Sequence, residues 1–309
     1  MIFYQEMLNR LNEILTAEQL EYKDTIIIGD NSSGKSDVLK NLILSDKEEK
    51  YYFIDAVNRY FDVSQIMPNP VQNVMYSPEI NVKRIEEDNF NKRDTFWDGG
   101  TRRAIEDFYC NFAEKLKKMM EEFLGISFDI QQGKMGVEVQ VDNESVDLSS
   151  GYQAVMRIFI EILYFADTKG MGVIVIDEID EFLSVKNSGR ILQYLRKTFP
   201  NLRFIVTTHS ADLIANAEDI NLILLSGSEF EILDANDFSS ISQVYDIFES
   251  VFEQKSDNDK EKTDTILRIL LNNKMSGVWG DEEESKLQYL KKRRITKAQK
   301  LIIKQIEAW

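Results

Sequence analysis

The sequence predicts an α/β fold in which a mostly parallel sheet is flanked by helices. The first observation is that three short segments, 25–28, 173–176 and 204–206, are apolar almost throughout. Runs of this kind are typical of central parallel strands that are covered on both faces. The second observation is that segments with apolar residues at helical spacing lie between these runs, which is the alternation expected of an α/β domain.

The other elements of this core follow from the same two patterns, taken in chain order. Apolar residues that recur every three or four positions predict helices over 3–15, 35–44, 152–166 and 188–198. Short apolar runs predict further strands over 51–54 and near 222–225 and 230–233.

An insert at about 64–124 interrupts the core and is expected to form a helical or lid-like segment. Residues 64–98 are polar and hold three of the four prolines, which indicates an excursion from the core with a possible strand at 71–76. A long amphipathic helix is expected from about 102 to 123. After it, residues 126–130 and 137–141 predict an antiparallel hairpin with its turn at Gly133.

The last third of the chain changes character. Beyond about residue 239 the sequence is highly charged and helical in pattern, so we expect a core domain over 1–238 and a helical C-terminal appendage over 239–309.

Composition restricts the classes of function. The net charge of −16 opposes broad, non-specific binding of nucleic acid, although it leaves room for a local basic groove. A single cysteine excludes an intrachain disulfide and a multi-cysteine zinc site. Because the N-terminus is neither basic nor strongly apolar, and no apolar run approaches the length of a membrane span, we expect a cytoplasmic protein without a membrane partner.

The strand at 25–28 runs into a phosphate-binding pattern, G-x-x-x-x-G-K-[ST], which a helix follows as the motif requires. Its residues are Gly29, Asp30, Asn31, Ser32, Ser33, Gly34, Lys35 and Ser36. Backbone N–H groups of such a loop turn inward around phosphate oxygens. Lys35 is expected to reach the β- and γ-phosphates of ATP, and Ser36 to ligate Mg²⁺. The alternative, a glycine turn with an exposed lysine, does not account for this context.

Two further strands are expected to end in reactive side chains at the same edge of the sheet. Asp177 and Glu178 follow the strand 173–176, and His209 follows the strand 204–206 after two threonines. We expect Asp177 to hold Mg²⁺, Glu178 to orient or deprotonate the attacking water, and His209 to hydrogen-bond the γ-phosphate. The alternatives are that Asp177 and Glu178 belong to a solvated acidic loop, and that His209 is structural or merely exposed.

The segment Leu148-Ser149-Ser150-Gly151-Tyr152-Gln153 precedes a predicted helix. Ser149 or Ser150 is expected to cap that helix, and a small, glycine-containing turn at a helix start is suited to bind phosphate. The alternative is an ordinary N-cap.

In this order, the four motifs resemble those of ABC-type ATPases, and most of all the RecF/SMC/OLD-like branch that includes short ATPases of bacterial anti-phage systems. The resemblance spans about residues 25–235 and implies a P-loop NTPase fold of ABC-ATPase type. It also implies a head-to-head dimer with two ATP molecules between the subunits. Ser149, Ser150 and Gly151 would then contact the γ-phosphate bound by the partner subunit.

The resemblance has further implications and some departures. A glutamine between the loop and the signature segment is implied as a metal contact, and Gln65 and Gln72 are both candidates. Ile179 stands where the family has proline, and a helix rather than a strand-rich stretch precedes the phosphate loop. The insert is too short for the long coiled coils of SMC proteins.

The function implied is that of a sensor or regulatory ATPase in a larger complex, whose separate effector is a nuclease or toxin of an anti-phage system. The alternatives are a nucleotide-gated scaffold with negligible turnover and a RecF/SMC-like DNA-repair ATPase, with a transporter subunit as a weaker idea.

The segment 286–304 contains eight basic residues and no acidic one, directly after the acidic run 281–284. Acids at a helix start and bases toward its end are explained by helix electrostatics alone. The functional alternative is a docking surface for nucleic acid or for an acidic partner.

Overall fold

The computed structural model describes most of the 309-residue chain: residues 2–17, 19–30, 32–56, 59–85, 96–98, 101–133, 136–238, 240–244, 259–275, 278–291 and 297–308. The chain divides into two compact units, residues 1–237 and 238–309. The boundary expected from the change in charge lies one residue further along. Each unit is described by itself below.

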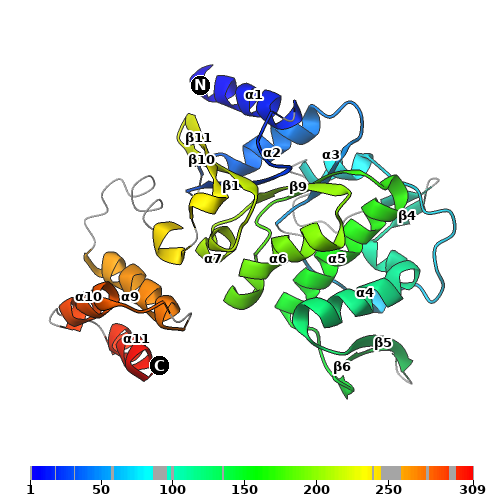
Figure 1. The fold of residues 1–309 in the computed structure, drawn as a ribbon. Helices are drawn as coiled ribbons and strands as arrows, with labels where there is room; N and C mark the ends of the chain where they lie inside the picture. The colour runs from blue at the N-terminus through cyan, green and yellow to red at the C-terminus, as the bar shows by residue number, and fades with distance from the viewer. Residues whose placement is uncertain are drawn as a thin grey trace. The chain divides into compact units, whose positions relative to one another are not determined.

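A six-stranded sheet forms the centre of the first unit, and Figure 1 labels four of its strands, β11, β10, β1 and β9. The full strand order is β11-β10-β1-β9-β8-β2. Its strands are β1 (Asp24–Gly29), β2 (Tyr51–Ile54), β8 (Gly172–Ile176), β9 (Leu202–Thr207), β10 (Ile220–Ser226) and β11 (Glu229–Asp234). All neighbouring strands are parallel except β10 and β11. The strands and the mostly parallel α/β class predicted from the apolar runs are therefore confirmed.

The register of the sheet decides which residues meet at its carboxyl edge. Thr207 of β9 is level with Ile27 of β1, and Val206 is level with Ile176 of β8. The ends of β1, β9 and β8 consequently lie side by side, and the segments that follow them emerge at one edge.

Two helices cover one face of the sheet, α1 (Ile2–Thr16) and α2 (Lys35–Leu44), as Figure 1 shows. Because side chains alternate across a strand, every second strand residue joins this core. The cluster combines apolar residues of both helices with strand residues that include Ile27, Phe53, Val175, Ile205 and Ile223. The helix predicted over 35–44 is confirmed with its four inward residues buried.

The opposite face is covered by α5 (Ser150–Lys169) and α6 (Val185–Thr198), with α4 (Tyr109–Leu124) and α7 (Ala211–Ala215) packed beside them. Here the other strand residues, among them Ile26, Tyr52, Ile174 and Phe204, are fully buried. The Tyr52 ring stacks on Phe165 of α5, with 5.3 Å between ring centroids. α5 exceeds the predicted helix 152–166 at both ends.

The insert differs from the prediction in two places. Residues 71–76 form no strand. Instead the Asn111 side chain binds both backbone groups of Val71, at 2.9 Å each, so they need no strand partner. The helix predicted from 102 begins only at 109, because 101–103 form β4 (Thr101–Arg103), paired with β3 (Phe96–Asp98).

Short helices complete the insert: the 3₁₀ turns η1 (Val63–Gln65) and η3 (Ile105–Phe108), and α3 (Glu79–Ile85). The predicted hairpin is confirmed as β5 (Phe128–Gly133) and β6 (Gly136–Val141), to which β7 (Glu144–Ser145) adds a third strand. The pair 134–135 between them lies outside the described residues. A further 3₁₀ turn, η4 (Ala235–Asp237), ends the first unit.

The second unit contains α9 (Asp259–Met275), α10 (Asp281–Lys291) and α11 (Lys297–Ala308). They share a core of Leu267, Leu270, Leu287, Leu290, Ile303 and Ile306. Two carboxylates at the acidic start of α10 bind residues that directly precede the helix. Glu283 accepts the N–H of Gly280 at 3.0 Å, and Glu284 accepts the indole N–H of Trp279 at 3.2 Å.

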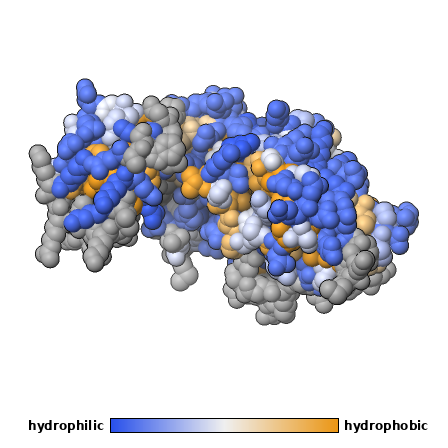
Figure 2. Space-filling view, turned by 90° about the horizontal axis from the view of Figure 1, so that it is seen from below, coloured by the Kyte–Doolittle hydropathy of each residue, from blue (hydrophilic) through white to orange (hydrophobic). Residues whose placement is uncertain are grey.

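None of the helices in the described ranges is long and apolar enough to cross a membrane. The face shown in Figure 2 is mostly hydrophilic, with hydrophobic residues in small patches between charged ones.

Candidate functional site

The phosphate loop connects the end of β1 to the start of α2. The Ser33 N–H donates to the Asp30 carbonyl at 3.0 Å, and Gly34 has φ +95°, which a residue with a side chain rarely adopts. Gly34 is also the N-cap of α2, and no side chain caps the helix. The first N–H groups of α2 are therefore available to an anion. Asn31 lies outside the described residues.

The packing of this loop fits a phosphate group. A Cβ atom on Gly29 would lie 2.2 Å from the Ser33 Oγ, and one on Gly34 would lie 2.1 Å from the Tyr4 Oη. The Ser33 hydroxyl is buried and has no hydrogen-bond partner in the described part of the chain. A tight loop that keeps buried donors unpaired is suited to receive an acceptor-rich ligand.

Lys35 lies over its own loop and is only 7% exposed. Its Nζ donates to the carbonyls of Gly29 at 2.9 Å and Asp30 at 3.1 Å. Burial lowers the pKa of Lys35, and the carboxylates of Glu178, Asp177 and Asp30 oppose this shift. A desolvated ammonium group at a helix N-terminus is a strong partner for phosphate oxygens.

Ser36 and Asp177, which the sequence predicts as metal ligands, are in direct contact. The Ser36 hydroxyl donates to Asp177 Oδ2 at 2.9 Å, and the Thr207 hydroxyl donates to Oδ1 at 2.6 Å. Hydroxyl and carboxylate oxygens are suitable ligands for Mg²⁺. Among the described residues no group of three or more His, Cys, Asp and Glu could hold a metal ion. Mg²⁺ at this pair would therefore need phosphate and water as its other ligands.

Glu178 has an unusual backbone. Its φ of +46° lies in the left-handed region, which is uncommon for glutamate. The Thr207 hydroxyl accepts its N–H at 2.7 Å, and the Thr207 carbonyl accepts the N–H of Ile179 at 3.1 Å. Burial, followed by the charges of Asp177 and Glu181, raises the pKa of Glu178. A carboxylate with a raised pKa is a better general base near neutral pH.

His209 faces Glu178, with 3.7 Å between Nε2 and Oε1. Burial, followed by the charge of Lys35, lowers the pKa of His209. The imidazole is therefore neutral at pH 7, and its contact with Glu178 is not an ion pair. A neutral imidazole at this place can donate one hydrogen bond to a phosphate oxygen.

The signature segment, Ser149 to Gly151, lies at the start of α5. The Ser149 hydroxyl caps α5 by accepting the N–H of Tyr152 at 3.3 Å, so the predicted cap is confirmed. A Cβ on Gly151 would lie 3.1 Å from the Phe182 carbonyl, and Ser150 is exposed. Within the described residues, no hydrogen bond joins Ser149, Ser150 or Gly151 to the phosphate loop. The helix start therefore packs beside the segment that follows Glu178, without a hydrogen bond to the five clustered residues among those described.

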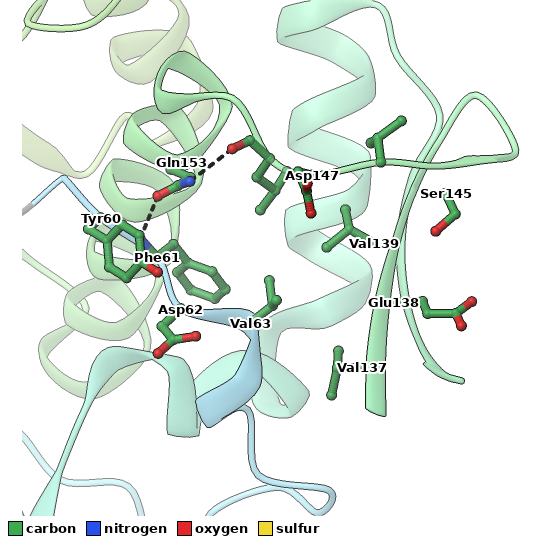
Figure 3. A pocket seen from close by; sticks show the side chains of 12 residues that line it. Tyr60, Phe61, Asp62, Val63, Val137, Glu138, Val139, Ser145, Asp147 and Gln153 are labelled. Carbon is green, nitrogen blue, oxygen red and sulfur yellow. Dashed lines mark hydrogen bonds between the residues drawn. The ribbon is translucent and has the colours of Figure 1, made fainter. Parts of the chain in front are cut away.

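A pocket of about 450 Å³ lies beside the signature segment, between η1 and β6 (Figure 3). Gln153 lines it and joins two segments. Its Nε2 donates to the Leu148 carbonyl at 2.9 Å, and its Oε1 accepts the N–H of Phe61 at 3.3 Å. The start of α5 is in this way connected to the segment that follows β2.

The two candidate glutamines are both exposed. Within the described residues, neither Gln65 nor Gln72 forms a side-chain hydrogen bond with Ser36 or Asp177. Thr207, which the sequence patterns did not predict as a site residue, contacts both Asp177 and Glu178. In the sequence, only its place in the threonine pair directly before His209 indicates that Thr207 lies at the site.

Replacing Thr207 with valine is expected to lower the free energy of unfolding by about 1–3 kcal/mol. The valine has the same shape but leaves the buried N–H of Glu178 without its acceptor. Urea denaturation measures the change, and Thr207→Ser is the control because it keeps the hydroxyl. An unchanged free energy of unfolding in Thr207→Val would contradict the stabilising role assigned to the hydroxyl, and any loss in Thr207→Ser measures the contribution of the methyl group.

Comparison with curated proteins shows similarity over about a fifth of the chain. It is 41% identical over 63 residues to the retron Ec83 probable ATPase of Escherichia coli, covering 20% of this chain and 12% of that protein. It is 39% identical over 66 residues to the retron Vc95 probable ATPase of Vibrio cholerae serotype O1 biovar El Tor, covering 21% and 13%. Septu protein PtuA of Bacillus mycoides (strain KBAB4) is 33% identical over 69 residues, covering 21% and 10%.

Two of these relatives are named probable ATPases, so the predicted resemblance to ATPases is confirmed for the matched stretch. The matches span only 10–13% of the relatives' own lengths. No family model matches the chain.

Among solved structures, the SMC head domain from Thermotoga maritima aligns with a TM-score of 0.37 and 13% identity, covering 69% of this chain and 90% of that one. A TM-score of this size does not by itself establish a shared fold. The assignment of a P-loop fold rests instead on the position of the phosphate loop after β1 and on the parallel strands beside it.

Proposed function

We propose that this protein is a Mg²⁺-dependent ATPase whose active form is a dimer with two ATP molecules held between the subunits. The observation that carries the proposal is the cluster at the carboxyl edge of the sheet. Lys35 lies in the phosphate loop, Ser36 is hydrogen-bonded to Asp177 at 2.9 Å, and His209 lies 3.7 Å from Glu178.

Each residue of the cluster has a distinct chemical role in this reaction. Lys35 and the N–H groups of α2 bind the β- and γ-phosphates, and Ser36 and Asp177 hold Mg²⁺, which neutralises charge on the phosphates. Glu178 accepts a proton from the attacking water, which its raised pKa favours. The neutral His209 donates a hydrogen bond to the γ-phosphate.

The dimer provides the signature segment with a ligand. Ser149, Ser150 and Gly151 lie at the start of α5 and form no hydrogen bond with the phosphate loop of their own chain among the described residues. A helix start is suited to bind an anion. The γ-phosphate bound by a second copy is the anion that we assign to it.

We further propose that this ATPase acts as the sensor or regulatory subunit of a larger complex with a separate effector, such as a nuclease or a toxin. Similarity to retron and Septu proteins supports a role in anti-phage defence. Purification of the native complex from its host tests this step. Complexes that never contain a nuclease or toxin would overturn it.

Two measurements test the ATPase itself. We expect release of phosphate from ATP that requires Mg²⁺ and stops with EDTA, and a doubling of the native mass when ATP is added. A chain that stays monomeric with ATP bound would contradict the dimer, and one without turnover would be a nucleotide-gated scaffold.

A mixing experiment tests whether the site is shared between subunits. Lys35→Met removes the loop lysine, and Ser150→Arg blocks the signature segment at an exposed position whose side chain makes no hydrogen bond in the structure. Each variant alone is expected to be inactive. In a mixed dimer, one of the two sites combines an intact loop with an intact signature. With equal amounts of the two variants about half of the dimers are mixed, so activity should return to about a quarter of the wild-type value. No recovery on mixing would indicate that the site lies within one chain.

No described contact favours nucleic acid as a partner. In the basic segment 286–304, Lys291 is paired with Glu307 at 2.5 Å, and Lys292, Arg293 and Arg294 lie outside the described residues. Lys286, Lys300 and Lys304 of this segment are exposed.

A further inference from the structure

Arg59 is a buried arginine that touches the backbone of the proposed catalytic residues. It lies between β2 and η1 and is 2% exposed. Its Nη2 donates to the Asp177 carbonyl at 2.7 Å and approaches the Glu178 carbonyl at 3.5 Å. Its Nε donates to the Asp55 carbonyl at 2.9 Å. Arg59 therefore reaches the site through backbone carbonyls rather than through side chains.

This arginine is costly to bury. Within the described residues it has no salt-bridge partner, and its Nη1 has no hydrogen-bond partner. Burial lowers the pKa of its guanidinium group, while the more distant carboxylates of Asp55, Glu161 and Asp177 raise it. Buried cations without an ion pair reduce stability, and an apolar residue of similar volume is often equally stable or better. The fold alone does not explain why arginine stands here.

The contacts of Arg59 complete a clamp on the strained peptide at Glu178. Thr207 accepts the Glu178 N–H at 2.7 Å on one side, and Arg59 binds the Asp177 carbonyl on the other. With φ at +46°, Glu178 holds a conformation that costs free energy and persists only where its surroundings enforce it. The direction of the Glu178 carboxylate depends on this backbone.

A second network connects the neighbourhood of Arg59 to α5. Glu161 of α5 is buried and paired with Arg157 at 2.5 Å and with Arg84 at 2.8 Å. Arg157 also donates to the carbonyl of Tyr60 at 3.4 Å, the residue after Arg59. The segment that carries Arg59 is thus attached to the helix that begins with the signature residues.

We propose that Arg59 is a positioning residue for hydrolysis, which holds the Asp177–Glu178 backbone so that the Glu178 carboxylate faces the attacking water. It acts through the backbone and touches neither the nucleotide nor the metal. The inference rests on the proposed ATPase function and deepens it.

The test compares two buried arginines. Arg59→Met removes the contacts with the Asp177 and Glu178 carbonyls. Arg84→Met is the matched control, because Arg84 is equally large, 7% exposed and bound to Glu161. In the described part of the chain, no hydrogen bond or ion pair joins Arg84 to Asp177 or Glu178. For both variants, the melting temperature, the Kd for ATP and the kcat are measured on the full chain.

Arg59→Met is expected to keep or raise the melting temperature, to bind ATP within about twofold of wild type, and to lose about 10- to 100-fold in kcat, since small misplacement of a catalytic group has effects of this size. Arg84→Met is expected to lower the melting temperature, because it breaks a buried ion pair, and to keep kcat within about threefold. Arg59→Lys should recover part of the kcat, since its ammonium can reach one carbonyl.

A kcat for Arg59→Met equal to wild type, or no lower than that of Arg84→Met, would overturn the inference. If Arg59→Met does not fold, the Arg59→Lys variant decides, because wild-type kcat in that variant excludes a need for the guanidinium geometry. Wild-type protein without any ATP turnover would overturn the proposed function, and the role of Arg59 with it.

Discussion

Replacing Glu178 with glutamine is expected to reduce ATP turnover by at least about 100-fold while leaving ATP binding intact. Glutamine keeps the size of the side chain, and the Thr207 and Arg59 contacts with the backbone remain. It cannot accept a proton from water, so only the chemical step is lost. Phosphate release and the Kd for ATP, measured side by side, separate the two effects.

The same variant should accumulate as the ATP-bound dimer, because hydrolysis is the step that ends this state. Native mass with ATP measures the fraction of dimer. Glu218→Gln is the control, since it removes the same charge from an exposed side chain outside this site. Equal turnover in wild type and Glu178→Gln would show that Glu178 is not the base, and would favour the nucleotide-gated scaffold.

Replacing Lys35 with methionine is expected to weaken ATP binding by about 10- to 100-fold and to abolish measurable turnover. A charge-assisted hydrogen bond to phosphate contributes about 1.5–3 kcal/mol, and each 1.4 kcal/mol is tenfold in Kd. Methionine fills the space of the aliphatic chain but carries no donor. Titration with ATP by calorimetry measures the affinity.

A second readout does not depend on turnover. A ligand that binds only the folded state raises the melting temperature, so ATP and Mg²⁺ should stabilise wild type and have little effect on Lys35→Met. Lys40→Met is the control, because Lys40 lies on the same helix, outside the phosphate loop. An undiminished stabilisation of Lys35→Met by ATP would contradict the assigned phosphate site.

The predictions from sequence succeeded where a local pattern has one physical cause. The run Ile26-Ile27-Ile28 is apolar because both faces of β1 are covered, and the helix after Gly34 begins where the loop ends. They were wrong in the insert. There the possible strand at 71–76 does not form, because Asn111, some 40 residues later, binds the backbone of Val71. Which side chain binds a given backbone group depends on the fold of the whole chain. A local sequence pattern therefore cannot predict it.

The sequence by itself determined the α/β class, the phosphate loop and the three strand ends that carry Lys35, Asp177-Glu178 and His209. Each of these depends on residues that are close together in the chain. Only the tertiary structure decided how these ends are aligned, and that Thr207 and Arg59 hold the backbone of Glu178 from two sides. The physical reason is that such contacts join residues about 30 and 118 positions apart, and their geometry depends on the register of the sheet and on burial.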